Sequence, residues 1–155
     1  MKLREFIKTD AINVSLNSSE REGVIGELVD GLVDAGALPT EFAPEIIAAL
    51  IKRERNGSTG FGKGVAVPHA KHPKVPALIC AIGLSNNGID FNALDHKPVH
   101  MVFLLLSPQG QDQAHLHAME VIFRSLNKDM FRRFLRQADT REKVIELLDE
   151  TDAGR

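Results

Sequence analysis

The sequence has no tryptophan, no tyrosine and only one cysteine, Cys80, which lies in an apolar segment. A single cysteine excludes a disulfide framework within the chain and is typical of a reducing compartment. We therefore expect Cys80 to be a small buried hydrophobe rather than a reactive thiol. The eight phenylalanines are scattered, no long basic run is present, and the formal net charge is −2. The sequence therefore lacks both the aromatic side chains on which bases stack and a basic surface for a nucleic-acid backbone. We expect no nucleic-acid partner.

Long hydrophobic runs are also absent. The longest, residues 101–106, has the length of a strand and is too short to span a bilayer. The first residues lack the apolar segment and the cleavage-like site of a signal peptide. We therefore expect no membrane insertion and a cytoplasmic location. The 155 residues fit one domain, 1–155, with a substantial core.

Hydrophobic periodicity predicts two helices in the first third of the chain. Apolar residues recur at helical spacing over 24–33, with Gly36 in the position of a C-terminal cap. The preceding Ser19 to Glu22 has the S-x-x-E form of a capping box. A second helix is expected from about residue 40 to Asn56-Gly57.

The remainder predicts strands followed by helices. Strands are expected at 65–68, 78–84 and 99–106, with a turn at 86–88 (Asn-Asn-Gly), and helices at 112–126, 129–136 and 140–148. Strand 99–106 is nearly all apolar, as expected of a central strand that is covered on both faces. The order of helices, strands and helices predicts an α/β fold, a three-layer domain with a mixed β-sheet flanked by helices.

A glycine-rich loop connects the second helix to the first of these strands. Residues 57–63 match the pattern G-x-x-x-x-G-K of a P-loop, but Gly64 stands where a P-loop has the Ser or Thr that holds magnesium. The loop also runs from helix to strand, which is the reverse of a P-loop. We therefore expect a tight turn, with backbone N–H groups that could face an anion, rather than a nucleotide site.

His69 is the most suggestive of the six histidines. It follows the glycine-rich loop and Pro68 at the end of the predicted strand 65–68, and ligand sites of α/β domains gather at strand ends. A structural or surface role explains its position equally well. A zinc site is not expected, because His69 and His72 do not have a known zinc spacing and Cys80 has no partner cysteine. No metal or other cofactor is expected.

His115 and His117 lie in the predicted helix 112–126. His115 shares one face with Met119 and Ile122, whereas His117 points the opposite way. The N–H groups and dipole of the helix N-terminus favour an anion and disfavour a protonated ring, so an inward-facing His115 suits a neutral hydrogen-bond donor. A core histidine with satisfied hydrogen bonds is an equally good explanation.

Arg53 lies near the end of the second predicted helix, on the flank of its apolar stripe. From there its side chain could reach inward over the glycine-rich loop. Taken alone, its position is better explained by a solvated cation at the helix end that stabilises the helix dipole.

Residues 53–69, with the sequence RERNGSTGFGKGVAVPH, resemble the active-site signature of the fructose/mannitol-type IIA domains of the bacterial phosphotransferase system. Ile89-Asp90-Phe91 with Asp95, Pro98-Val99, and the segment 102–108 followed by His115-Leu116 show the same likeness. The resemblance extends over nearly the whole chain, and the segment 57–69 is long and specific.

The resemblance implies that His69 accepts a phosphoryl group, with His115 beside it and Arg53 near the site. The donor is then the small histidine-containing phosphocarrier protein, and transfer needs neither metal nor nucleotide. Ser58 and Thr59 are candidates for hydroxyl bonds to the phosphoryl group. The family fold, a mixed sheet flanked by helices, agrees with the prediction above.

A single-domain chain of this length resembles members of the nitrogen-related branch of this family. Those members are mainly regulatory and act on partners such as a transporter or kinase. A single-domain IIA subunit of sugar uptake, which hands the phosphoryl group to a IIB domain, fits the same motifs. No motif separates the two, and a homo-oligomer is left open.

Overall fold

The computed structural model describes residues 1–154 as an α/β domain. Two short 3-10 turns, η1 (Leu3–Glu5) and η2 (Thr40–Phe42), accompany the strands and helices. In chain order these are β1 Ile7–Asn13, α1 Arg21–Asp34, α2 Ala43–Arg55, β2 Gly60–Gly62, β3 Val65–Ala66, β4 His69–His72, β5 Ile79–Ile89, β6 Val99–Pro108, α3 Asp112–Leu126, α4 Asp129–Gln137 and α5 Arg141–Asp152.

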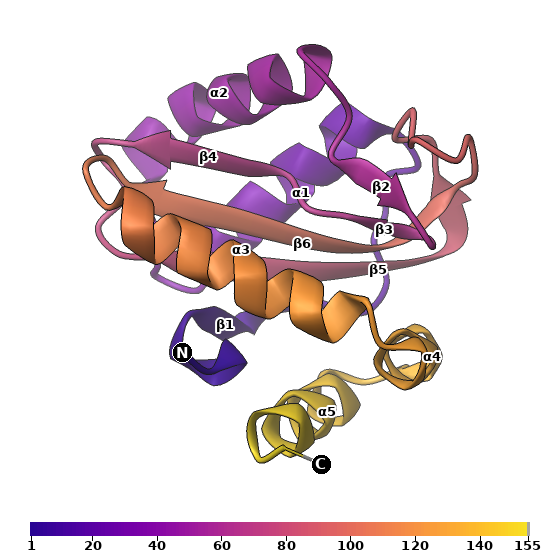
Figure 1. Ribbon diagram of the computed structural model, residues 1–155. Coiled ribbons are helices and arrows are strands. Elements are labelled where there is room, and N and C mark those ends of the chain that lie inside the picture. The colour runs from indigo at the N-terminus through magenta and orange to yellow at the C-terminus, as the bar shows by residue number, and fades with distance from the viewer. Residues whose placement is uncertain (155) are drawn as a thin grey trace.

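The six strands form one mixed sheet with β6 at its centre (Figure 1). Its main path is β1-β5-β6-β3-β2, and β4 also pairs with β6 beyond β3. β5 is antiparallel to β6, whereas β3 and β4 are both parallel to it and β1 is parallel to β5. This arrangement explains why β6 is the most apolar segment of the sequence.

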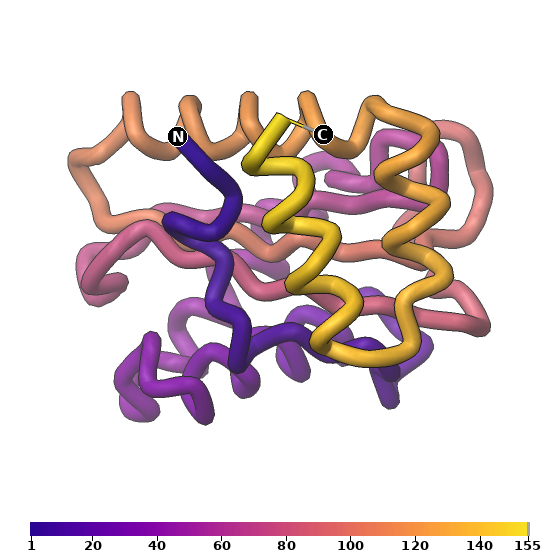
Figure 2. The backbone as a smooth tube through the Cα atoms, turned by 90° about the horizontal axis from the view of Figure 1, so that it is seen from below, coloured from indigo at the N-terminus to yellow at the C-terminus, as the bar shows by residue number. Residues whose placement is uncertain are grey.

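Helices cover both faces of the sheet. α1 and α2 lie on one face, and α3, α4 and α5 lie on the other (Figures 1 and 2). Because side chains alternate along a strand, Phe103 and Leu105 of β6 pack in the cluster under α3–α5, and Leu104 and Leu106 pack in the cluster under α1 and α2. The predicted three-layer α/β architecture with a mixed sheet is confirmed.

The two ends of the chain meet on the α5 side of the sheet (Figure 2). The backbone N–H groups of Leu3 and Arg4 donate to the Asp152 carboxylate at 2.7 and 2.9 Å. No helix within residues 1–154 has both the length and the apolar character that a membrane crossing requires. Cys80 is fully buried, as predicted, and burial raises the pKa of its thiol.

The predicted capping box is wrong. α1 begins at Arg21, after Glu20, and no side chain caps its first turn. Glu20 is held in an extended conformation because it forms an isolated parallel bridge with Asp90, and its N–H donates to Ser18 Oγ. A contact 70 residues away in sequence therefore sets the start of the helix. Gly36 follows the end of α1 at φ +76°, as the C-cap prediction requires.

The predicted turn at 86–88 is also wrong, because β5 continues through it to Ile89. The pairing of β5 with β6 shifts register between Leu84 and Ile89, so the extra residues form a bulge in one strand rather than a hairpin. Gly88, at φ +90°, donates its N–H to Ser85 Oγ. A Cβ there would lie 2.8 Å from Pro98 Cβ, which explains the glycine.

The glycine-rich segment forms a hairpin. β2 and β3 are antiparallel, and the two residues between them, Lys63 and Gly64, have φ values of 60° and 77°. Positive φ at both central positions is typical of the tightest hairpin connection. The predicted tight turn is therefore confirmed, although β2 itself was not predicted.

Candidate active site

His69 begins a strand rather than ending one. β3 stops at Ala66 and β4 starts at His69, so the predicted strand 65–68 has the wrong bounds. Pro68 interrupts the ladder because it has no N–H, while its carbonyl still accepts from Leu105 N at 2.9 Å. His69 is then paired with Leu105 of β6, on the face of the sheet that α3 covers.

The His69 ring is half-buried and held by its own backbone. Its Nδ1 lies 2.8 Å from the carbonyl oxygen of Val67. A carbonyl can only accept, so Nδ1 carries the hydrogen and Nε2 holds the lone pair. Burial, followed by the charges of Arg53 and Lys71, lowers the pKa of His69, and the Val67 carbonyl and Glu54 oppose this shift. The ring is therefore neutral at pH 7, with its lone pair on Nε2.

His115 faces His69 from α3. The two ring centroids are 5.5 Å apart, and the rings are inclined by 56°. His115 is 8% exposed, and its Nδ1 lies 2.5 Å from Ser107 Oγ. Burial first, then the charges of His69 and Lys71, lower the pKa of His115 to about 4. His117 is exposed. The prediction that His115 points inward and His117 outward is confirmed.

Lys71 and Asp112 add a charged edge to the site. Lys71 is two residues after His69 on β4, so its side chain lies on the same face of the sheet. Its Nζ is 2.9 Å from the carboxylate of Asp112, the first residue of α3. The ion pair thus connects the strand of His69 to the helix of His115.

Arg53 lies over the loop that precedes β2. Its guanidinium Nη1 donates to the carbonyl of Gly57 at 2.7 Å, and the side chain is half-buried. Its charge also contributes to the lowered pKa of His69. The Arg53 side chain therefore reaches over the glycine-rich loop. Its part in a phosphoryl site at His69 stays a prediction.

Glu54 is a buried carboxylate beneath the same loop, only 2% exposed. Its Oε2 accepts from Thr59 N at 3.1 Å, and its Oε1 accepts from the Thr59 hydroxyl. One side chain therefore ties the end of α2 to the start of β2. We call this contact the Glu54–Thr59 clamp.

The hydroxyls of Ser58 and Thr59 are engaged within the loop. Ser58 Oγ donates to the carbonyl of Phe91 and accepts from Gly60 N at 3.0 Å, while the Thr59 hydroxyl donates to Glu54. Both side chains thus determine the shape of the loop. A direct bond from either to a phosphoryl group stays a prediction, and it would require the present bonds to be exchanged.

Comparison with known proteins identifies the family. Residues 5–151 match the family described as the phosphoenolpyruvate-dependent sugar phosphotransferase system, EIIA 2. The chain belongs to this family.

Relatives of this EIIA chain are named either nitrogen regulatory proteins or fructose-specific EIIA or EIIABC components. It is 34% identical over 143 residues to a nitrogen regulatory protein of Pseudomonas aeruginosa, covering 92% of this chain and 90% of the relative. It is also 34% identical over 152 residues to a fructose-specific EIIABC component of Bacillus subtilis, covering 98% of this chain but 24% of the relative. The chain thus spans about a quarter of that longer protein.

A solved structure agrees with the fold. The crystal structure of nitrogen regulatory protein IIA-Ntr from Neisseria meningitidis superposes with a TM-score of 0.83 at 26% identity. The match covers 93% of this chain and 97% of the other.

Sequence reasoning missed Glu54, Ser107 and Lys71. Glu54 had a visible signal, because it continues the apolar stripe of α2 by one step of four after Leu50, and a charge in that position is expected to be paired. For Ser107 and Lys71 the sequence holds no comparable signal, apart from the alternation of side chains along their strands. Their partners, His115 and Asp112, belong to α3.

Residues 1–154 hold no cluster of three or more His, Cys, Asp or Glu side chains that could ligate a metal ion. His72, the nearest candidate in sequence, has its Nε2 3.3 Å from the Glu45 carboxylate of α2.

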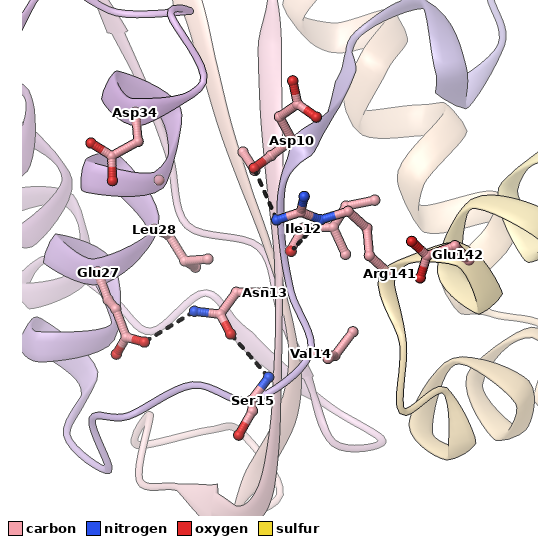
Figure 3. Close-up of a pocket in the computed structure, with 12 residues that line it drawn as sticks. Asp10, Ile12, Asn13, Val14, Ser15, Glu27, Leu28, Asp34, Arg141 and Glu142 are labelled. Carbon is pink, nitrogen blue, oxygen red and sulfur yellow. Dashed lines mark hydrogen bonds between the residues drawn. The ribbon is translucent and has the colours of Figure 1, made fainter.

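A separate groove of about 510 Å³ lies along β1, between α1 and α5 (Figure 3). There Arg141 donates to the carbonyls of Ile12 and Asp10 at 3.2 and 3.3 Å. On the α1 side, Asn13 donates to Glu27. These contacts occupy polar groups along an edge strand and thereby protect it from pairing with another chain.

Proposed function

We propose that this EIIA chain is a phosphoryl carrier. Nε2 of His69 accepts a phosphoryl group from a phosphohistidine of the small histidine-containing phosphocarrier protein and passes it on. The observation that carries the proposal is the bond of His69 Nδ1 to the Val67 carbonyl, which leaves the lone pair on Nε2. A neutral imidazole with a free lone pair is the form that acts as a nucleophile.

The transfer balances without a separate proton step. The lone pair of Nε2 forms the new N–P bond, and the N–P bond of the donor breaks with its electrons returning to the donor ring. The donor ring, protonated on its other nitrogen, leaves as neutral imidazole. The positive ring charge moves to His69, whose Nδ1–H keeps its bond to Val67. The carbonyl and the charge of Glu54 both favour that cation.

The surroundings of His69 suit the transferring group. Phosphoryl transfer depends mainly on positioning and on stabilising charge on the equatorial oxygens. Arg53 and Lys71 supply positive charge near His69. His115, neutral because its pKa is lowered to about 4, is placed to donate one hydrogen bond without competing as the acceptor.

We further propose that the chain acts in the nitrogen-related regulatory branch, where its phosphorylation state alters a complex with a transporter or kinase. The high coverage of the Pseudomonas aeruginosa relative on both chains supports this choice. The second candidate is a IIA subunit that hands the phosphoryl group to a IIB domain, and the Bacillus subtilis relative supports it.

The test is incubation of the purified chain with phosphoenolpyruvate and the general phosphotransferase proteins. Intact mass should increase by one phosphoryl group, peptide mapping should place it on the His69 peptide, and acid should remove it. His69→Ala should take up none, and a label that survives acid or persists in this variant would contradict the proposal. Pull-downs with each form, and discharge onto a purified IIB domain, separate the two roles.

A further inference from the structure

Ser107 is a buried hydroxyl on the central strand. It is 0% exposed and lies on β6 in step with Phe103 and Leu105. α3 covers this face of the sheet (Figure 1). An apolar residue of similar size would satisfy the packing at this position. A hydroxyl removed from water is unfavourable without a hydrogen-bond partner. The partner of Ser107 is Nδ1 of His115, at 2.5 Å.

The direction of this bond follows from the one hydrogen that Ser107 carries. If His115 Nδ1 were protonated, Ser107 would have to accept, and its own O–H would need a second acceptor. Within residues 1–154 the Ser107 side chain makes no hydrogen bond other than that to Nδ1. Buried donors without an acceptor are rarer in proteins than acceptors with an unused lone pair. Ser107 therefore donates and Nδ1 accepts.

We propose that Ser107 is a positioning residue that holds His115 in the tautomer with its hydrogen on Nε2. This inference rests on the proposed function, in which His115 donates a hydrogen bond to the phosphoryl group carried by His69. The opposite tautomer would present a lone pair to the phosphoryl oxygens and repel them. Ser107 thus acts on the reaction through His115 alone.

The groups that face His115 agree with a neutral ring in this role. His69 and Lys71 approach it from β4, and Asp112 lies one turn earlier on α3. Burial is the largest cause and the charge of Lys71 acts in the same direction, and together they outweigh Asp112 and keep the ring unprotonated at pH 7. In a neutral imidazole only one nitrogen carries hydrogen. When Nδ1 accepts a hydrogen bond from Ser107, the ring hydrogen must therefore be on Nε2.

The first test is nitrogen NMR of the wild-type chain, labelled at the histidine ring nitrogens, at pH 7. We expect His115 to show a protonated Nε2 and an unprotonated Nδ1. In Ser107→Ala the preference should weaken to a mixture, and Ser107→Thr, which keeps the hydroxyl, should restore it. A wild-type ring protonated on Nδ1, or an unchanged tautomer in Ser107→Ala, would overturn the proposal.

The second test is a double-mutant cycle on phosphoryl transfer. Ser107→Ala should slow discharge of His69, but by less than the roughly ten-fold expected for His115→Ala, because part of the ring population keeps its hydrogen on Nε2. In the His115→Ala background the same change should have no further effect, whereas in the His117→Ala background it should keep its full effect. An equal effect in both backgrounds would mean that Ser107 serves packing only. If the wild-type chain takes up no phosphoryl group, the proposed function fails, and the NMR result still decides the tautomer.

Discussion

Glu54 offers a sharp test of how the loop before His69 is held. Its carboxylate is 2% exposed and accepts both the N–H and the hydroxyl of Thr59, which is itself 7% exposed. Glu54→Ala removes the acceptor and leaves two buried donors without a partner. Breaking such a contact costs about 3–5 kcal/mol, since the remaining groups lose the bonds but stay out of water.

Glu54→Gln is the matched control for charge. Its amide oxygen can still accept from Thr59 N–H and its NH2 can donate to the Thr59 oxygen, so two contacts to Thr59 remain, while the negative charge and the acceptor of the Thr59 hydroxyl hydrogen are lost. We expect a cost of about 1 kcal/mol. Thr59→Val removes the hydroxyl bond alone and should fall between the two. Urea unfolding followed by circular dichroism measures all three. If Glu54→Ala and Glu54→Gln lowered the free energy of unfolding equally, or if neither lowered it, the Glu54–Thr59 clamp would be refuted.

Three further predictions concern the charges around His69. Arg53→Ala should slow transfer at least several-fold while lowering the free energy of unfolding by only a few tenths of a kcal/mol, as rapid-quench kinetics and a thermal melt can show; unchanged transfer would remove Arg53 from the site. His115→Ala should still accept a phosphoryl group on His69 but discharge it about ten-fold more slowly, whereas His117→Ala should match wild type, and the reverse pattern would contradict the placement of α3. Because the pKa of His115 is lowered to about 4, the unfolded chain binds a proton between pH 6.5 and 4 that the folded chain does not. The free energy of unfolding should therefore fall by up to about 3 kcal/mol as the pH drops through that window, and His115→Gln should flatten this dependence.

Features set by local periodicity could be predicted from the sequence. The helical repeat of α3 places His115 and His117 on opposite sides whatever the helix packs against, so their orientation followed from spacing alone. The apolar run of β6 identified the central strand because only a strand covered on both faces is so uniformly apolar. The layer order followed from these elements.

Features set by contacts distant in sequence could not be predicted. The bridge between Glu20 and Asp90 overrides a capping pattern that is valid in isolation. The bulge before Ile89 exists because β5 continues along β6, so Asn-Gly residues that favour a turn are taken into a strand. Ser107 acquires its partner only when α3 folds back across the sheet. In each case the local signal was real, and pairing across the sheet determined the result.

On the proposed function, the charges around His69 suit a phosphoryl group that must both arrive and leave. Arg53 and Lys71 favour the phosphoryl oxygens, but each already has a partner, at Gly57 O and Asp112. Binding a phosphoryl oxygen would therefore exchange one contact for another rather than add a new one. Glu54 and the Val67 carbonyl favour the cationic ring, which in the proposed phosphohistidine would keep the N–P bond activated for the next transfer. A site with free cations and no buried carboxylate would hold the phosphoryl group more tightly and release it more slowly. On the proposed function, the opposing charges of Arg53 and Glu54, adjacent on one helix, keep acceptance and release close in free energy.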